Sequence, residues 1–346
     1  MTPSELLASS AAAASEAFGH LQQALFEHVV QPVAFSLGLA NHLETAFDGT
    51  GWLLVGLLQL AVMVLVFGSL ERLRPAERQG ASSAERAAVR TDVIYTLIHK
   101  LGLVRIGLFF TVEPLFDLVF GKLRLLGFDG WQIDSIWPGV TNVAWVSFLL
   151  YLLVFDFVDY LLHRGQHRWA WWWHLHALHH SQQRMTLWSD TRNHVLDDVI
   201  RASAMVTVAH LIGVGPGQFI AIVALTQLVE SLSHANIRLS FGRLGERLLV
   251  SPRFHRLHHG IGIGHESHGA GSLGGHNFAV LFPVWDVLFG TARWRDPVQP
   301  TGIRDQLPGG AAGLPQVARR ADGSRDYGSG FWQQQWLGLL RLAGRA

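Results

Sequence analysis

Residues 140–167 read VTNVAWVSFLLYLLVFDFVDYLLHRGQH, an apolar run that ends in two histidines. From Val140 to about Leu162 the run is long enough to cross a hydrocarbon core of roughly 30 Å as a helix. His163 and His167 follow four residues apart, so they share one face of that helix. The stretch predicts a membrane helix that presents two imidazoles at its end.

The composition of the whole chain agrees with a membrane protein. Of its 346 residues, 49% are hydrophobic and only 15% are charged, whereas soluble domains are about 25% charged. The net charge of +1 excludes the strong basic excess of a nucleic-acid-binding protein. The absence of cysteine excludes disulfides, thiolate metal sites and iron–sulfur clusters. We therefore predict an all-α, polytopic membrane protein with no nucleic-acid partner.

Three further segments are predicted to enter the bilayer. Residues 52–70 form an uncharged run, and residues 92–121 form a less regular one that His99, Lys100 and Arg105 interrupt. Residues 195–233 read as a hairpin broken at a glycine-rich turn, which brings the expected total to about four membrane helices. The linker 71–90 carries five arginines against three glutamates, and such an excess marks the cytoplasmic side. The histidine clusters are accordingly expected to face the cytoplasm, in a bacterial inner membrane.

Two further histidine clusters share one spacing, HALHH at 176–180 and HRLHH at 255–259. Histidines at i, i+3 and i+4 lie on one side of a helix, and neutral imidazole is the commonest metal ligand. Eight such ligands exceed the needs of one ion, so they indicate a pair of metals. An all-nitrogen pair without thiolates fits iron and O₂ best. The predicted ligands are His163, His167, His176, His179, His180, His255, His258 and His259.

Other polar residues near these clusters are candidates for the same site. His194 and His234 are expected either to bind metal or to hydrogen-bond a ligand. Asp156, Asp159 and Glu230 are predicted to accept the free N–H of a ligating imidazole, although Asp159 could pair with a nearby arginine and Glu230 could itself be a ligand. The glycine-rich loop that contains His265, His268 and His276 is expected to form a lid without ligands.

These motifs resemble the fatty acid hydroxylase / sterol desaturase superfamily of membrane di-iron oxygenases, over roughly Val140 to Trp294. The resemblance rests on the three histidine clusters, on RNH at 192–194, on HAN at 234–236 and on WDVLFGT at 285–291. It implies a helical membrane fold with a cytosolic cap that holds two iron ions. It also implies O₂-dependent hydroxylation or desaturation of an unactivated C–H bond in a membrane lipid. Lipid 2-hydroxylases of this family carry a second histidine where this chain has Glu230.

The resemblance also organises the chain into four parts. Residues 1–50 are an interfacial segment, 51–137 a first membrane hairpin with a basic linker, 138–295 the di-iron domain, and 296–346 a tail with an amphipathic helix. No haem, flavin or dinucleotide motif is recognisable, so electrons are expected from an external ferredoxin- or cytochrome-type donor. A membrane metal transporter and a zinc hydrolase are the alternatives. The clustering of histidines at span ends argues against the first, and the lack of an H-E-x-x-H motif argues against the second.

Overall fold

The computed structural model describes residues 3–77, 82–261, 275–294, 300–310 and 319–345. Within these ranges the chain forms helices and loops, and extended segments pair only at isolated bridges. The predicted all-α class is therefore confirmed.

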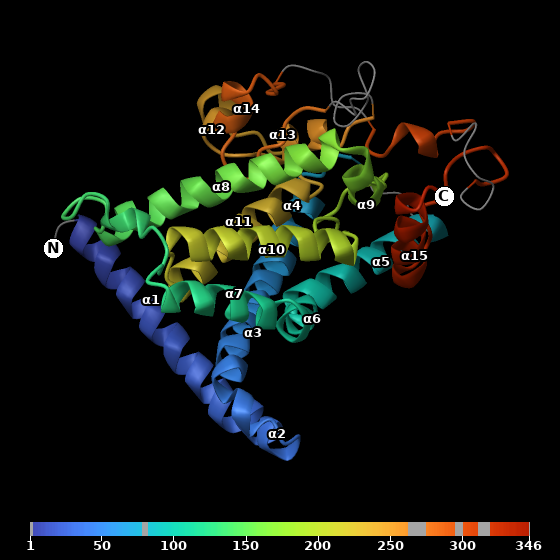
Figure 1. Cartoon of the computed structure of the whole chain (residues 1–346). Helices are drawn as coiled ribbons and strands as arrows, with labels where there is room; N and C mark the ends of the chain where they lie inside the picture. Colours follow the sequence, from blue (N-terminus) through green and yellow to red (C-terminus); the bar gives the residue numbers. More distant parts are fainter. Residues whose placement is uncertain (1–2, 78–81, 262–274, 295–299, 311–318, 346) are drawn as a thin grey trace.

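The N-terminal region forms an arm followed by the first membrane span. Helices α1 (Pro3–Leu25) and α2 (Gln31–Ser36) are joined by a π-helical turn and project from one side of the molecule (Figure 1). Helix α3 (Leu43–Val62) returns from the arm and continues through a second π-helical turn into α4 (Gly68–Leu73). The continuous segment Ala40–Leu73 contains the expected first span and is long and apolar enough to cross a membrane.

The interrupted segment that follows is divided into three helices. Helix α5 (Ser83–Lys100) begins with a capping box in which Ser82 and Glu85 satisfy each other's backbone N–H groups. It meets α6 (Leu103–Thr111) at a bend of 52°, so the two helices make a third span only if they are counted as one. Helix α7 (Glu113–Leu125) follows at once. His99, Lys100 and Arg105, which interrupt the apolar run in the sequence, lie around this bend.

The second clear span is α8 (Ala144–Arg168), as residues 140–167 predict. The expected hairpin forms as α10 (Val195–Ile212) and α11 (Pro216–His234), with Gly213 in a left-handed conformation at the turn. In the described part of the chain, two helices, or three with the bent pair, are long and apolar enough to span the membrane, and neither hairpin helix is among them. The expected total of about four is therefore not confirmed.

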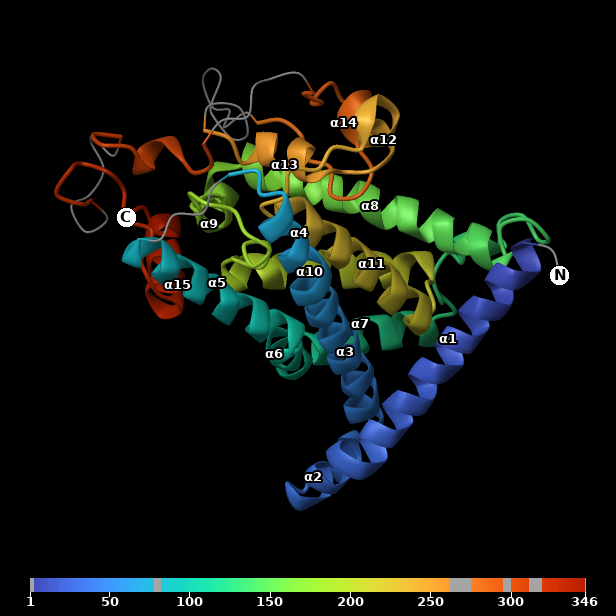
Figure 2. The same cartoon turned by 180° about the vertical axis from the view of Figure 1, so that it is seen from behind.

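The remaining helices form a cap around the end of α8. Figure 2 shows α9 and α13 beside the last turns of α8, above the α10–α11 hairpin. The C-terminal helix α15 packs against α9 and α5. Its Trp332 and Trp336 are exposed, as expected of a helix at the membrane surface. The cap helices are α9 (Ala170–His180), α12 (Gly242–Leu248), α13 (Pro252–His258), α14 (Val284–Leu288) and α15 (Phe331–Leu342).

One close approach between helices places a charged side chain inside the membrane region. A Cβ atom on Gly56 of α3 would lie 1.7 Å from the carbonyl oxygen of Lys100, so only glycine allows α3 to pack against the end of α5. The ammonium group of Lys100 is buried and donates a hydrogen bond to Gln59 Oε1 at 2.9 Å. Lys100 is thereby directed into the interior of the protein.

Candidate metal centre

The structure gathers nine of the ten predicted histidine ligands into two buried groups. The first group draws two side chains from α8, two from α9 and one from α13, and the second draws one from α9, one from the end of α11 and two from the α13 segment. Within each group the potential ligand atoms all lie within 4.8 Å of one another. Group one is His163, His167, His176, His180 and His258, and group two is His179, His234, His255 and His259.

Each histidine triplet is divided between the two groups in the same way. The i, i+4 pair stays together, and the i+3 member turns to the other group. On α9 the pair His176 and His180 belongs to group one while His179 belongs to group two. On the α13 segment His255 and His259 belong to group two while His258 belongs to group one. Successive positions on a helix differ by about 100°, so one short helix can face two neighbouring centres.

The nitrogen atoms of group two converge as metal ligands do. His234 Nε2 lies 3.0 Å from His179 Nε2 and 2.9 Å from His255 Nε2, and His259 Nε2 lies 3.1 Å from His255 Nε2. Two ligands at right angles with metal–nitrogen bonds of about 2.1 Å are roughly 3.0 Å apart. These rings therefore fit a shared metal ion.

The opposite ring nitrogens are held by hydrogen bonds that leave the Nε2 atoms free to coordinate. His163 Nδ1 donates to the carbonyl of Phe278 at 2.8 Å, and His258 Nδ1 donates to that of His276 at 2.8 Å. His234 Nδ1 donates to the Glu230 carbonyl at 2.8 Å. Among the described residues, the buried Nε2 atoms of His163 and His176 have no hydrogen-bond partner. Such fixed tautomers with inward-facing lone pairs are typical of metal-binding histidines.

Burial keeps the imidazoles in the form that binds metals. Desolvation, followed by the neighbouring His234, lowers the pKa of His179 well below its usual value. Desolvation, followed by the neighbouring His259, does the same to the pKa of His180. Because a neutral imidazole is the ligand form, the two groups are prepared to bind cations without first losing protons.

Two carboxylates that the sequence reasoning missed lie beside the ligands. Asp197, in the first turn of α10, accepts hydrogen bonds from Gln166 Nε2 at 2.8 Å and Trp172 Nε1 at 2.5 Å, and its Oδ2 lies 3.3 Å from His176 Nδ1. Burial alone would raise the pKa of Asp197, but these hydrogen bonds hold that pKa below its usual value. Asp190 Oδ1 lies 3.6 Å from His234 Nδ1. A sequence feature could have pointed to Asp197, because it is an acid in the first helical turn after RNH at 192–194.

The three predicted carboxylates have other partners. Asp156 accepts hydrogen bonds from the backbone N–H of Leu281 and from Trp285 Nε1, and so fixes the loop beyond α13. Asp159 pairs with Arg201 at 3.0 Å, and Glu230 lies 3.6 Å from the same guanidinium group. Asp159 therefore pairs with an arginine from α10 and not with the nearby Arg164 or Arg168. The Glu230 side chain lies near Arg201, and the Glu230 carbonyl accepts the hydrogen bond from His234.

The tenth predicted ligand, His194, lies outside both groups. It caps the N-terminus of α10, where its Nδ1 accepts a hydrogen bond from the Leu196 N–H at 3.1 Å. Its Nε2 donates to the Gln335 carbonyl at 2.9 Å, so neither nitrogen is left for a metal. His265 and His268 lie outside the described residues, and the carbonyl of His276 accepts the hydrogen bond from His258.

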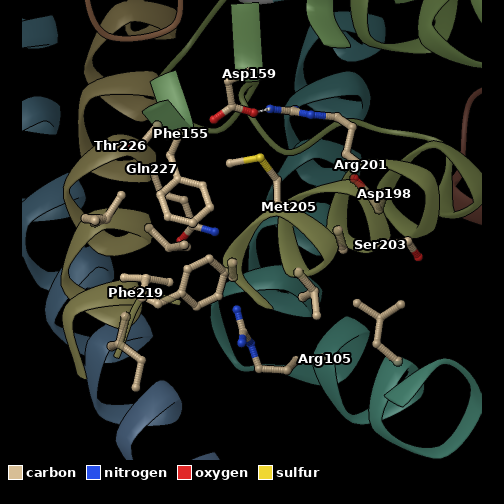
Figure 3. A pocket seen from close by; sticks show the side chains of 18 of the residues that line it. Arg105, Phe155, Asp159, Asp198, Arg201, Ser203, Met205, Phe219, Thr226 and Gln227 are labelled. Carbon is tan, nitrogen blue, oxygen red and sulfur yellow. Dashed lines mark hydrogen bonds and ion pairs between the residues drawn. The ribbon is translucent and has the colours of Figure 1, made fainter. Parts of the chain in front are cut away.

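A cavity of about 680 Å³ runs from the histidines into the membrane region. Five ligand candidates line its inner end, while α6 and α7 enclose its outer end. Figure 3 shows Asp159 and Arg201 at one end and Arg105 at the other, with Phe155, Met205 and Phe219 between them. The cavity therefore has a polar inner end, an apolar middle and a polar outer end.

Comparison with known proteins agrees with this geometry. The family model for fatty acid hydroxylase matches residues 148–291, a region that begins inside α8, ends beyond α14 and contains both histidine groups. Residues 148–291 belong to the fatty acid hydroxylase family. The family resemblance proposed from the sequence is thereby confirmed, and it identifies the chain as an oxidoreductase.

Two curated relatives support the assignment. The chain is similar to ornithine lipid hydroxylase OlsE of Rhizobium tropici, with 26% identity over 249 residues, which cover 72% of this chain and 70% of the relative. It is also similar to alkylglycerol monooxygenase of Caenorhabditis elegans, with 25% identity over 169 residues, which cover 49% of this chain and 30% of the relative. No solved structure matches the chain.

Proposed function

We propose that this chain hydroxylates an unactivated C–H bond of a membrane lipid, with two iron ions and O₂ as cofactors. The observation that carries the proposal is the pair of buried imidazole groups at the inner end of a cavity. The two relatives support a lipid substrate, since their names refer to an ornithine lipid and an alkylglycerol. The same names, a hydroxylase and a monooxygenase, favour hydroxylation over desaturation.

Each imidazole group would hold one ion. Group one offers five nitrogen ligands and group two offers four, and carboxylates lie nearby. Iron bound in such nitrogen-rich sites, together with O₂, supplies the oxidising power that cleavage of an unactivated C–H bond requires. The protein contributes the ligand positions, which rigid helices set.

The surrounding residues orient the ligands and keep the site dry. Asp197 fixes His176, and the carbonyls of Phe278 and His276 fix His163 and His258. Each of these contacts selects the tautomer whose Nε2 lone pair faces the group. The apolar middle of the cavity, which includes Phe155 and Phe219, excludes water from the path of the lipid chain.

The location of the site implies how substrate and electrons arrive. Leu103 and Ile106 of α6 and Leu115 and Leu118 of α7 are exposed on the outside of the cavity wall, as expected where helices contact lipid. A membrane lipid would therefore reach the cavity from the bilayer. Since the sequence has no recognisable haem, flavin or dinucleotide motif, a ferredoxin- or cytochrome-type donor would deliver the electrons. It would deliver them to the cap, which we place on the cytoplasmic face of a bacterial inner membrane.

Two measurements test the proposal. Purified protein should contain two iron atoms per chain by mass spectrometry. Lipid extracts of cells that express the gene should contain a species heavier by one oxygen atom, labelled when cells grow under ¹⁸O₂. About one zinc per chain without lipid oxidation would instead indicate a hydrolase, and labile, substoichiometric metal would indicate a transporter.

A further inference from the structure

The cap helix α14 and the residue that follows it present an exposed apolar patch, which we call the α14 patch. Between Gly275 and Ala292 the single Asp, Glu, Lys or Arg is Asp286, and its side chain is buried. A helix at a water-exposed surface normally presents polar side chains, so this patch is expected to contact an apolar partner. The α14 patch consists of Val284, Val287, Leu288 and Phe289.

The α14 patch lies beside the membrane helix α8, at the height of residues 156–160. Trp285 Nε1 donates a hydrogen bond to Asp156 at 2.7 Å, and the ring of Phe289 stacks on that of Tyr160 with centroids 5.4 Å apart. The apolar run of α8 continues to about Leu162, so Asp156 lies about 9 Å before its end along the helix. Helix α14 therefore runs beside a part of α8 that is apolar enough to lie in the hydrocarbon core (Figure 1).

The irregular backbone that leads into α14 is paired within the protein. Asp156 accepts hydrogen bonds from the N–H groups of residues 281 and 282 at 2.9 and 3.1 Å. Asp286 accepts hydrogen bonds from those of residues 278 and 279 at 3.0 and 2.7 Å. Non-helical backbone is tolerated at membrane depth only where the protein itself satisfies its polar groups. The two buried carboxylates therefore allow this loop to enter a bilayer.

Arginines lie at the limits of the α14 patch. The guanidinium group of Arg164, just beyond the apolar run of α8, lies 5.6 Å from the ring centroid of Phe289. Arg293 is exposed soon after the patch ends. Arginines at the ends of an apolar segment extend their charge to the lipid headgroups. Their positions therefore fit a patch that enters one leaflet and does not cross the bilayer.

We propose that α14 is inserted into the bilayer, where the α14 patch contacts the acyl chains of the leaflet that surrounds the end of α8. Leu153 and Leu161 of α8 are 42% and 45% exposed and lie on either side of Asp156 along the helix, as expected of a surface in contact with the same lipids. The loop before α14 contains Phe278, whose carbonyl fixes His163. The inference goes beyond the proposed function, because it assigns a membrane contact to the segment that orients one of the ligands.

The test uses single cysteines as attachment sites for a spin label, since the chain has no cysteine of its own. Full-length Leu288→Cys, Leu153→Cys and Ala321→Cys are labelled and placed in vesicles of phosphatidylcholine and phosphatidylglycerol. Power saturation in electron paramagnetic resonance compares collisions with O₂, which concentrates in hydrocarbon, and with a nickel chelate, which stays in water. We expect the O₂-to-nickel ratio at Leu288→Cys and Leu153→Cys to be at least about tenfold that at the exposed control, Ala321→Cys.

A ratio at Leu288→Cys equal to that at Ala321→Cys would overturn the inference, because α14 would then lie in water. Poor access of both reagents to Leu288→Cys would also overturn it, because the patch would then face a second copy or another protein. Val287→Cys, which replaces another exposed side chain of the patch, should give the same result as Leu288→Cys. The measurement requires neither iron nor lipid oxidation, so its failure would leave the proposed function intact.

Discussion

Replacement of Asp197 by asparagine should release iron while leaving the fold in place. The asparagine side chain would keep the shape of the carboxylate but not its charge, and its amide group would face donors on Gln166, Trp172 and His176. At least one of three buried hydrogen bonds would be lost. A buried hydrogen bond to a charged group contributes about 1.5–3 kcal/mol, which corresponds to a loss of about 10- to 100-fold in metal affinity.

The assay adds an iron chelator to purified protein and measures the loss of protein-bound iron over time. Asp305→Asn is the matched control, because Asp305 also accepts hydrogen bonds, from Arg325 at 3.0 Å and Tyr327 at 3.0 Å, but contacts neither histidine group. The control should retain iron like the unmodified protein. If Asp197→Asn retained iron equally well, the reasoning that a charged partner orients His176 would be refuted.

Three further predictions concern the ligands, the C-terminal helix and pH. His179→Ala and His258→Ala remove one ligand from different groups, so each should lower the iron content measured by mass spectrometry, and full iron in either variant would contradict the assignment. Gly338→Val should destabilise the protein by about 1–3 kcal/mol in thermal unfolding, because a Cβ at Gly338 would lie 2.3 Å from His194 Cδ2. Gly107→Val is the control, since a Cβ at Gly107 meets open space and should cause no steric destabilisation. In protein stripped of metal by a chelator, burial lowers the pKa of the imidazoles, so the unfolded chain binds more protons than the folded one as the pH falls. The melting temperature should therefore decrease below about pH 6.5. A constant melting temperature down to about pH 5 would contradict this prediction.

Helical spacing could predict that these histidines gather at one site, but it could not predict that each triplet is divided between two groups. Two triplets and one pair required no knowledge of how distant helices pack, and the structure brings all eight of these residues to the two groups. His194 could not be excluded in the same way. Its nitrogens are used by Leu196 and by Gln335, and the latter contact depends on α15 docking more than a hundred residues later in the chain.

The carboxylate partners could not be predicted for a related reason. Asp159 is in register with His163 on α8, which suggested a contact along one helix, but Arg201 from α10 reaches Asp159. Asp197 contacts His176 across a separation of 21 residues, and only the packing of α10 against α9 creates that contact. Hydropathy also could not decide whether α10 spans the membrane, because two of its charged residues, Asp198 and Arg201, line the protein's own cavity.

The two groups differ in size because of what α8 and α11 add to them, not because of the divided triplets. Helix α9 contributes two histidines to group one and one to group two, and the α13 segment does the reverse, so these two triplets alone would give three ligands to each group. Helix α8 then adds two to group one, and the end of α11 adds His234 to group two. Since His234 is the single contribution of α11, and its Nε2 lies within 3.0 Å of two other ligand nitrogens, group two depends on the position of that helix end. Helix α11 also carries Glu230 and lines the cavity. The position of the α11 end is therefore a direct requirement of group two, whereas group one has no ligand candidate on that helix.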